Sequence, residues 1–568
     1  MRTVLIHSFY LSLSLLVASQ QVVATPVDRQ FTNSGIFIVF SQPQYAPGDT
    51  AYFAGYLLAG ENQVAGNKQI VSIKLLGPNK EIIHHGRVLF QDGTGNSQII
   101  IPHNSKSGVY QIVSYVETGS VKQAPVLHVG HIAISSRDLT AENGHHTTHA
   151  EEDTSKLTVE TDRTKYGRRS KVRVSVASKV NEVEGSLNEV SIAVYNELLF
   201  SDNTDRELMS SFKAIGMEPA IIQNKGSSIA IDYPNYFMGK AFINPSGEAV
   251  PDSSKITFYL NESDFVYVVY TKSGGNFNFP LFKNFGNEEV FYRISYKGDL
   301  LTDSYIALYN APVNVETIKG THSDTMTAYS LYAKQKQIID KSYHYFTARD
   351  TKTQSRKRLS SDVEADSEIF LENYEPFSSM AEVFSNIIPT VRYKKSGDDV
   401  RIRIFLKSSA QYGDNNPLYI VDGIMTDDTQ YVLNFDPKHV RKIRVLRSEE
   451  TLIRFGDLGI NGIVVIETDI THANEDIRNS RNSLSVIGID YPLAYKKVTY
   501  EQNLINTRVP DLRACLYWNP KVDLNKLRSF EFFTADDIGY YIIQIAGLIN
   551  GQPFLSTRRF YVTQPVSR

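Results

Sequence analysis

The sequence predicts a mainly β protein, built of several β-sandwiches and one small α+β domain. Three observations support this prediction. Tyr and Phe, which favour strands, number 33 and 29 among 568 residues. Short apolar runs recur along the chain, separated by turn pairs such as Pro47-Gly48 and Asp92-Gly93. In one stretch, from Met380 to Thr468, such runs alternate with short helical patterns.

Length and composition predict about three to five domains, at roughly 100–200 residues each. Hydrophobic residues make up 42% of the chain, which is enough for several buried cores. The net charge of −3 gives no general attraction to nucleic acid or to anionic lipid. We therefore expect no nucleic-acid partner.

Residues 1–24 have the pattern of a signal peptide. Arg2 supplies the positive charge, Leu5 to Ala18 form the apolar stretch, and Val22-Val23-Ala24 has the small residues of a cleavage site. No later run reaches about 18 apolar residues, so the mature chain is expected to contain no transmembrane segment. These features predict an exported protein, in the periplasm or associated with the outer membrane.

The chain contains one cysteine, Cys515. A single cysteine excludes an intrachain disulfide and a zinc site of several thiolates. Because Cys515 lies in an apolar, strand-like context, we expect a buried core residue rather than a reactive thiol.

Residues 31–135 are predicted to form a first β-sandwich, because short strands alternate with turns at regular intervals. The expected strands are 36–40, 51–58, 70–76, 82–90, 96–101 and 108–116.

The turn from Tyr45 to Thr50 and the later Ser107-Gly108-Val109-Tyr110 resemble the macroglobulin-type domains of the alpha-2-macroglobulin superfamily. This resemblance implies an Ig-like or macroglobulin-like sandwich. The thioester chemistry of that superfamily is not expected, because it needs a Cys-Gly-Glu-Gln type of sequence, and Leu516 follows Cys515.

Four further units are expected from the same signals, beyond a polar linker at 136–156. The turn from Tyr166 to Lys171 repeats the Tyr45 turn without the proline, and it predicts a second sandwich. Apolar residues between Met326 and Tyr343 recur at helical spacing. The expected boundaries are 157–260 for the second sandwich, 265–315 for a third β unit, 316–374 for a helical segment with a polar linker, and 484–568 for a C-terminal sandwich.

Residues 375–470 are predicted to be the α+β domain. A helix is expected from Met380 to Ile388, and Asp436 and Pro437 are suited to begin a second helical turn. Strands are expected at Tyr419-Ile420-Val421, Ile443-Arg444-Val445-Leu446-Arg447 and Ile463 to Thr468, with turns at Asp422-Gly423 and Asn461-Gly462.

The order of these runs, with Phe455-Gly456 between the last two, resembles the plug domain of TonB-dependent outer-membrane receptors. In such receptors a barrel of roughly twenty strands follows the plug. About a hundred residues follow here, so the resemblance implies a plug-like domain with no barrel in this chain.

No motif predicts catalysis, a cofactor or a metal centre. The sequence lacks a Gly-x-Ser-x-Gly elbow, a His-Glu-x-x-His pair and a phosphate-binding Gly-rich loop. His84 and His85 are interpreted as surface or turn residues, and Asp422 as a turn residue. The pair Asp427 and Asp428 could bind calcium, but a turn role is favoured. A linker site formed by His145, His146 and His149 is also possible, but ligands in a linker are not preorganised.

We therefore expect a non-enzymatic cell-envelope adaptor, whose plug-like domain docks on an outer-membrane transport or secretion partner. The alternative is a binder of an extracellular protein, peptide or polysaccharide through the sandwiches. In that case aromatic residues would contact the ligand, and the candidates are Tyr233, Tyr236, Phe237 and Trp518. An enzyme with a site assembled across domains is a third class. The sequence does not predict the oligomeric state.

Overall fold

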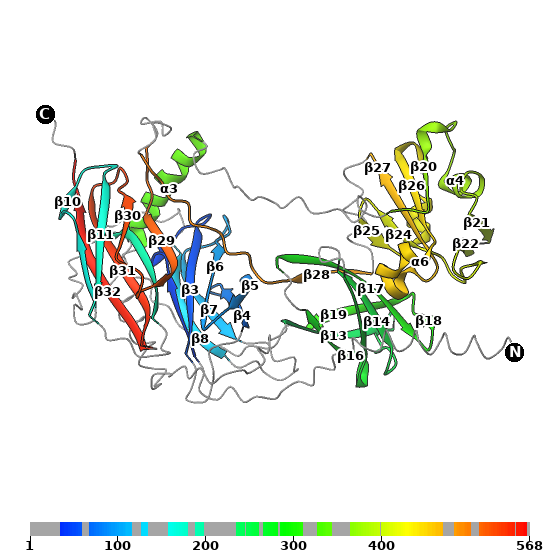
Figure 1. Ribbon diagram of the computed structural model, residues 1–568, viewed down its shortest axis with the longest axis horizontal. Helices are drawn as coiled ribbons and strands as arrows, with labels where there is room; N and C mark the ends of the chain where they lie inside the picture. The colour runs from blue at the N-terminus through cyan, green and yellow to red at the C-terminus, as the bar shows by residue number, and fades with distance from the viewer. Residues whose placement is uncertain are drawn as a thin grey trace. The chain divides into compact units, whose positions relative to one another are not determined.

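A computed structural model describes most of the chain, and Figure 1 shows its elements. The described residues are 35–58, 68–115, 126–134, 157–179, 188–197, 235–244, 246–260, 265–281, 285–309, 326–343, 364–397, 399–469, 482–500, 510–550 and 552–564. The expected signal peptide, the 136–156 linker with its histidines, and Tyr233 lie outside these residues.

The mainly β prediction is confirmed: three β-sandwiches, each with one three-stranded and one five-stranded sheet, and one α/β unit account for the strands described. No helix among the described residues is long and apolar enough to cross a membrane. The first sandwich contains β1(Gly35–Phe40), β3(Thr50–Leu58) and β6(Thr94–Ile100) in one sheet, and β2(Gln44–Tyr45), β8(Val126–Ile134), β7(Gly108–Tyr115), β4(Gln69–Leu76) and β5(Ile82–Phe90) in the other.

The second sandwich joins two distant parts of the chain. Its smaller sheet contains β9(Leu157–Thr161), β11(Lys171–Ser178) and β30(Ser529–Phe533). Its larger sheet contains β10(Lys165–Tyr166), β32(Gln552–Val562), β31(Gly539–Ile549), β12(Glu189–Asn196) and β29(Cys515–Asp523). Figure 1 shows the cyan and red strands of these two parts interleaved, and the two sheets share one core. This pairing differs from the expected separate sandwiches at 157–260 and 484–568.

The first and second sandwiches have the same strand order, with β9 to β12 and β29 to β32 in the places of β1 to β8. The repeated turn also has a similar hydrogen-bonding pattern in both sandwiches. In one, the Tyr45 hydroxyl lies 3.2 Å from Ser41 Oγ and accepts from the Gln42 amide. In the second sandwich, the Tyr166 hydroxyl donates to Asp162 Oδ1 at 2.6 Å and accepts from the Arg163 amide. The internal repeat predicted from the two turns is therefore present.

The third sandwich also takes strands from three expected units. Its smaller sheet contains β16(Asn276–Leu281), β13(Asn235–Ile243) and β19(Ser304–Tyr309). Its larger sheet contains β15(Phe265–Tyr270), β14(Lys255–Leu260), β17(Asn287–Tyr296), β18(Asp299–Leu300) and β28(Ser483–Ile487). The expected boundaries at 260 and 315 thus cut through one sandwich, because local sequence patterns give strand positions but not strand partners.

The α/β unit, residues 367–468, lies in sequence between β19 and β28, after helix α3(Met326–Tyr343). Its main sheet contains β20(Ser367–Phe370), β26(Val440–Leu446), β27(Ile463–Thr468), β24(Leu418–Val421) and β25(Ile424–Thr426), and a second sheet contains β21(Val391–Ser396), β22(Asp399–Leu406) and β23(Gln411–Tyr412). The helical elements are η4(Leu371–Asn373), α4(Met380–Asn386), α5(Thr429–Leu433), η5(Pro437–His439), α6(Glu449–Leu452) and η6(Ile453–Gly459).

Local predictions for this unit are confirmed. Asp436 caps η5 by accepting from the Lys438 amide, and Pro437 occupies the first turn. Helix α4 begins after Ser379, whose side chain accepts from the Glu382 amide. The unit starts at β20, however, a few residues before the expected boundary at 375.

Both faces of the main sheet are buried, which explains its continuous apolar runs. One face, with Tyr419 and Val464, packs with α4. The other, with Ile420 and Val465, packs in one cluster with Tyr259 and Phe291 of the third sandwich. The α/β unit is therefore seated on that sandwich through a hydrophobic face.

Candidate functional site

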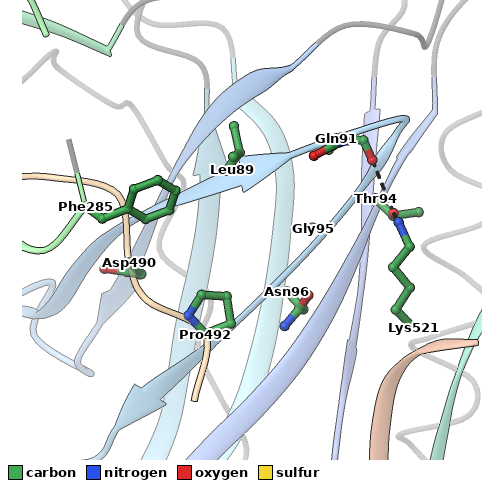
Figure 2. A pocket seen from close by; sticks show the side chains of 9 residues that line it. All are labelled: Leu89, Gln91, Thr94, Gly95, Asn96, Phe285, Asp490, Pro492 and Lys521. Atoms are coloured by element: carbon green, nitrogen blue, oxygen red, sulfur yellow. Dashed lines mark hydrogen bonds between the residues drawn. The ribbon is translucent and has the colours of Figure 1, made fainter. Parts of the chain in front are cut away.

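A pocket lies beside the strap, the segment 488–495 that follows β28 (Figure 2). Its volume is about 210 Å³. The lining residues come from the end of β5, from β6, from the strap, from β29 and from the segment before β17: Leu89, Gln91, Thr94, Gly95, Asn96, Phe285, Asp490, Pro492 and Lys521.

The strap is fixed by hydrogen bonds to the first sandwich. The Asp490 amide donates to the Arg87 carbonyl at 2.7 Å. The Gln98 side chain donates to the Tyr491 carbonyl at 3.0 Å and accepts from the Leu493 amide at 2.8 Å. This places the Asp490 carboxylate close to β5, where a Cβ added at Gly86 would lie 2.3 Å from Asp490 Oδ2.

Asp490 is the acidic group of the pocket. Burial raises the pKa of its carboxyl to about 6, although the Ser97 hydroxyl, 3.2 Å from Oδ2, and Arg87 both act in the opposite direction. The carboxyl can therefore take up a proton near neutral pH.

Lys521 is the basic group of the pocket. Its Nζ lies 3.0 Å from Thr94 Oγ1 and 3.4 Å from Glu189 Oε2. Phe285, which stacks on Tyr491 at 5.3 Å, adds an aromatic surface. An acid, an ammonium group and an aromatic ring around a small hollow suit a polar ligand group of limited size.

The second candidate surface lies on the α/β unit, on the α6–η6 segment. Ile453, the first residue of η6, and Ile460, directly after η6, are 73% and 66% exposed. These fractions are larger than those of the other large hydrophobic side chains described. Phe455, between them, is fully buried and stacks on Tyr259 at 5.7 Å. Arg293 pairs with Asp427 at 2.5 Å and holds the same junction. The two exposed isoleucines are thus presented from an anchored element.

The acids singled out in the sequence have structural roles. Asp422 has a φ of 48° and accepts from the Thr468 amide at 2.8 Å, which confirms its turn role. Asp427 is paired with Arg293, and Asp428 caps α5 by accepting from the Tyr431 amide. No group of three or more metal-ligating residues occurs within the described ranges.

Two of the aromatic candidates are buried. Trp518 and Phe237 are 3% and 5% exposed and belong to hydrophobic cores. Tyr236 lies on β13, and only its backbone belongs to the described part of the structure. The structure therefore gives no support to ligand binding by Trp518 or Phe237.

The histidine interpretation is corrected. His84 and His85 lie within strand β5, inside the strand expected at 82–90, and they are half-buried rather than on the surface or in a turn. Burial lowers the pKa of His84 to about 4 and that of His85 to about 3, and the Tyr115 hydroxyl lies 3.2 Å from His85 Nε2. Cys515 is buried as expected.

Sequence reasoning missed Asp490 and Lys521. Nothing in their local sequence marks them, since they are about thirty residues apart and meet only in the tertiary structure. A bend signal at Tyr491-Pro492 does mark the strap itself.

No protein-family model and no curated protein matches the sequence. Among solved structures, trypsin-activated Escherichia coli alpha-2-macroglobulin aligns with 94% of this chain at 9% identity and a TM-score of 0.16, and the native form does so at 8% identity and a TM-score of 0.24. This chain spans 24% and 40% of those two chains. The Yersinia pseudotuberculosis adhesin InvE aligns with 50% of this chain and 60% of its own at 13% identity and a TM-score of 0.14. At these TM-scores the likenesses carry no argument about function.

Proposed function

We propose that this chain is a non-enzymatic adaptor of the cell envelope, whose α/β unit docks on an outer-membrane transport or secretion partner. The observation that carries the proposal is the exposure of Ile453 and Ile460 on an element that is itself firmly anchored. Large apolar side chains displayed by a rigid element favour a protein contact. The plug-like order of strands and turns supports the same class of partner.

The anchoring of the unit is central to this function. Because the sheet face with Ile420 and Val465 is covered by the third sandwich, docking must use the remaining surface of the unit. The sandwiches would then act as spacers that position the α/β unit. Export to the periplasm or to the outer membrane is part of this proposal.

Site-specific cross-linking in the native envelope tests the adaptor function. A photoreactive amino acid replaces Ile453, and in a matched control it replaces Lys395, which is exposed on β21 of the same unit. We expect position 453, and not 395, to yield a cross-linked outer-membrane protein that mass spectrometry identifies. Recovery of the uncross-linked chain alone from both would refute the docking role.

The pocket favours a second function, the binding of an extracellular peptide or polysaccharide. Asp490 and Lys521 offer an acceptor and a donor across a small hollow. Peptide and glycan libraries screened against the full mature chain test this function. Saturable binding should be lost in Lys521→Ala and kept in Lys526→Ala, whose side chain is 86% exposed outside the pocket. Equal binding by both variants would exclude the pocket.

A further inference from the structure

The β21–β22 hairpin of the α/β unit is strongly basic. Residues 391–407 contain six lysines and arginines and two aspartates, although the whole chain has a net charge of −3. The hairpin lies beside helix α4 (Figure 1), and its apolar side chains join the core of the unit. The charge is therefore carried by a folded sheet and not by a linker.

The strand register gathers four of these cations on one face. Arg392 lies opposite Arg403, and Lys394 lies opposite Arg401. Because side chains alternate along a strand, these four point to the same side of the sheet. The next residues in sequence point to the other side, where Ile402 is fully buried in the core. We call the outward side, with its four cations, the basic face.

The two cationic pairs of the basic face are closely spaced. The Phe405 amide donates to the Thr390 carbonyl at 2.8 Å, so these two opposed residues form a hydrogen-bonded pair. Hydrogen-bonded pairs recur at every second residue, so both cationic pairs are of this kind, with Cα atoms about 5.5 Å apart. The two pairs are separated along the strands by about 7 Å. Four positive charges thus occupy a small, flat area.

Most of this charge is not neutralised within the described residues. Arg401 pairs with Asp399 at 2.9 Å, and its side chain is still 59% exposed. The Arg392 guanidinium lies over the Tyr412 ring, 4.0 Å from its centroid, which orients the group without cancelling its charge. Arg392, Lys394 and Arg403 have no acidic partner in the described part of the chain.

Such an arrangement is unfavourable for the sheet by itself. Like charges directly opposite each other destabilise a pair of strands, and the basic face contains two such pairs. Departures from local rules of this kind are typical of functional sites. An anionic partner that lies across both pairs would relieve the repulsion.

The chemistry of the face favours a lipid surface over a protein. Among the described residues of 391–412, none is a large hydrophobic side chain with an exposed surface comparable to that of Ile453. Protein interfaces usually contain an apolar or aromatic core, which the basic face lacks. An anionic bilayer presents a planar array of phosphates and attracts each nearby lysine or arginine without an apolar anchor.

We propose that the basic face of the β21–β22 hairpin binds the phosphate groups of an anionic lipid bilayer. Charge complementarity selects the partner, and the flat sheet allows both cationic pairs to contact it together. This surface contact goes beyond the docking role of Ile453 and does not depend on it.

Flotation with lipid vesicles tests the proposal on the full mature chain. The vesicles contain phosphatidylcholine alone, or equal parts of phosphatidylcholine and the anionic phosphatidylglycerol. We expect binding to the anionic vesicles only, and weaker binding as salt rises, because salt screens exposed charges. The vesicles hold no protein, so the outcome is separate from docking on an outer-membrane partner.

A double variant, Arg392→Gln with Arg403→Gln, removes one cationic pair. Each cation near an anionic surface contributes about fivefold to binding, so we expect the partition coefficient to fall at least tenfold. Replacing both arginines by lysine keeps the charges and should retain binding. The matched control, Lys165→Gln with Lys526→Gln, removes two exposed charges from the second sandwich and should bind like the wild type. Circular dichroism should show all variants folded.

A fluorescent label locates the contact. Ser396→Cys places the label at the end of β21, and Lys526→Cys places it on the second sandwich as a control. The native Cys515 is buried and should stay unlabelled in the folded chain. We expect stronger energy transfer to a headgroup-labelled lipid from position 396 than from position 526. Stronger transfer from position 526 would contradict docking through the hairpin.

Other outcomes would also overturn the proposal. One is the absence of binding to anionic vesicles at low salt, and another is an equal loss of binding in the hairpin variant and its control. Displacement by inorganic phosphate beyond that caused by sodium chloride of equal ionic strength would indicate a site for free phosphate instead. Binding of polyglutamate without binding of vesicles would indicate an acidic protein segment as the partner.

Discussion

The raised pKa of Asp490 predicts that the strap is less stable at neutral pH than in mild acid. The native pKa of about 6 and the ordinary value of 3.8 differ by an amount equivalent to about 3 kcal/mol. Between these two pH values the unfolded carboxyl is ionised while the native carboxyl keeps its proton. The native state then binds more protons, so stability falls as the pH rises from about 4 to about 6.

Asp490→Asn removes this dependence, since the amide keeps an oxygen that can accept from the Ser97 hydroxyl. We expect the variant to match the wild type at about pH 4 and to exceed its local stability by up to about 3 kcal/mol above pH 6. Hydrogen exchange of peptides covering the strap, corrected for the intrinsic pH dependence, measures the opening free energy. The control is Asp299→Asn on the exposed strand β18.

The reasoning would be refuted if the wild type and Asp490→Asn showed parallel opening free energies from pH 4 to pH 7. A variant whose opening free energy exceeded that of the wild type by the same amount at every pH would also contradict it. At low pH the Asp490 carboxyl is neutral in both the native and the unfolded state, so it should behave like the amide.

Three further predictions follow from buried groups. Phe455→Ala should destabilise the α/β unit by about 3–5 kcal/mol in urea unfolding, whereas Ile453→Ala should change little, and equal effects would contradict the seating of the unit on the third sandwich. In the native chain the buried Arg513 guanidinium lies 2.7 Å from the Asp511 carboxylate. Asp511→Ala removes this partner, so the free energy of unfolding should fall by about 3–5 kcal/mol. A fall below about 1 kcal/mol would show that the pair is dispensable. Burial raises the pKa of the Cys515 thiol to about 11, so a disulfide reagent should label it slowly in the native chain and rapidly in urea, and equal rates would place the thiol at the surface.

Two kinds of local chemistry could be predicted from the sequence. Turn residues fixed the ends of strands, as in the Tyr45 and Tyr166 turns, and the capping pair Asp436-Pro437 began η5. These features depend on residues within a few positions of each other, so the sequence contains all the information that they need.

The candidate site could not be predicted in the same way. Asp490 and Lys521 come together because the strap binds β5, while β29 pairs with β12 from a distant part of the chain. The basic face of the β21–β22 hairpin also depends on the strand register, which places Arg392 opposite Arg403.

The sequence by itself determined where the strands and helices lie, that they form sandwiches and an α/β unit, and that Cys515 is buried. Only the tertiary structure decided which strands pair, and it placed β12 beside β29 across the whole segment 197–514. The physical reason is that alternation of apolar and polar residues specifies which face of a strand is buried, while any strand with a matching face can occupy the neighbouring position. Pairing is settled by the packing of a complete core, to which residues from both ends of the chain contribute.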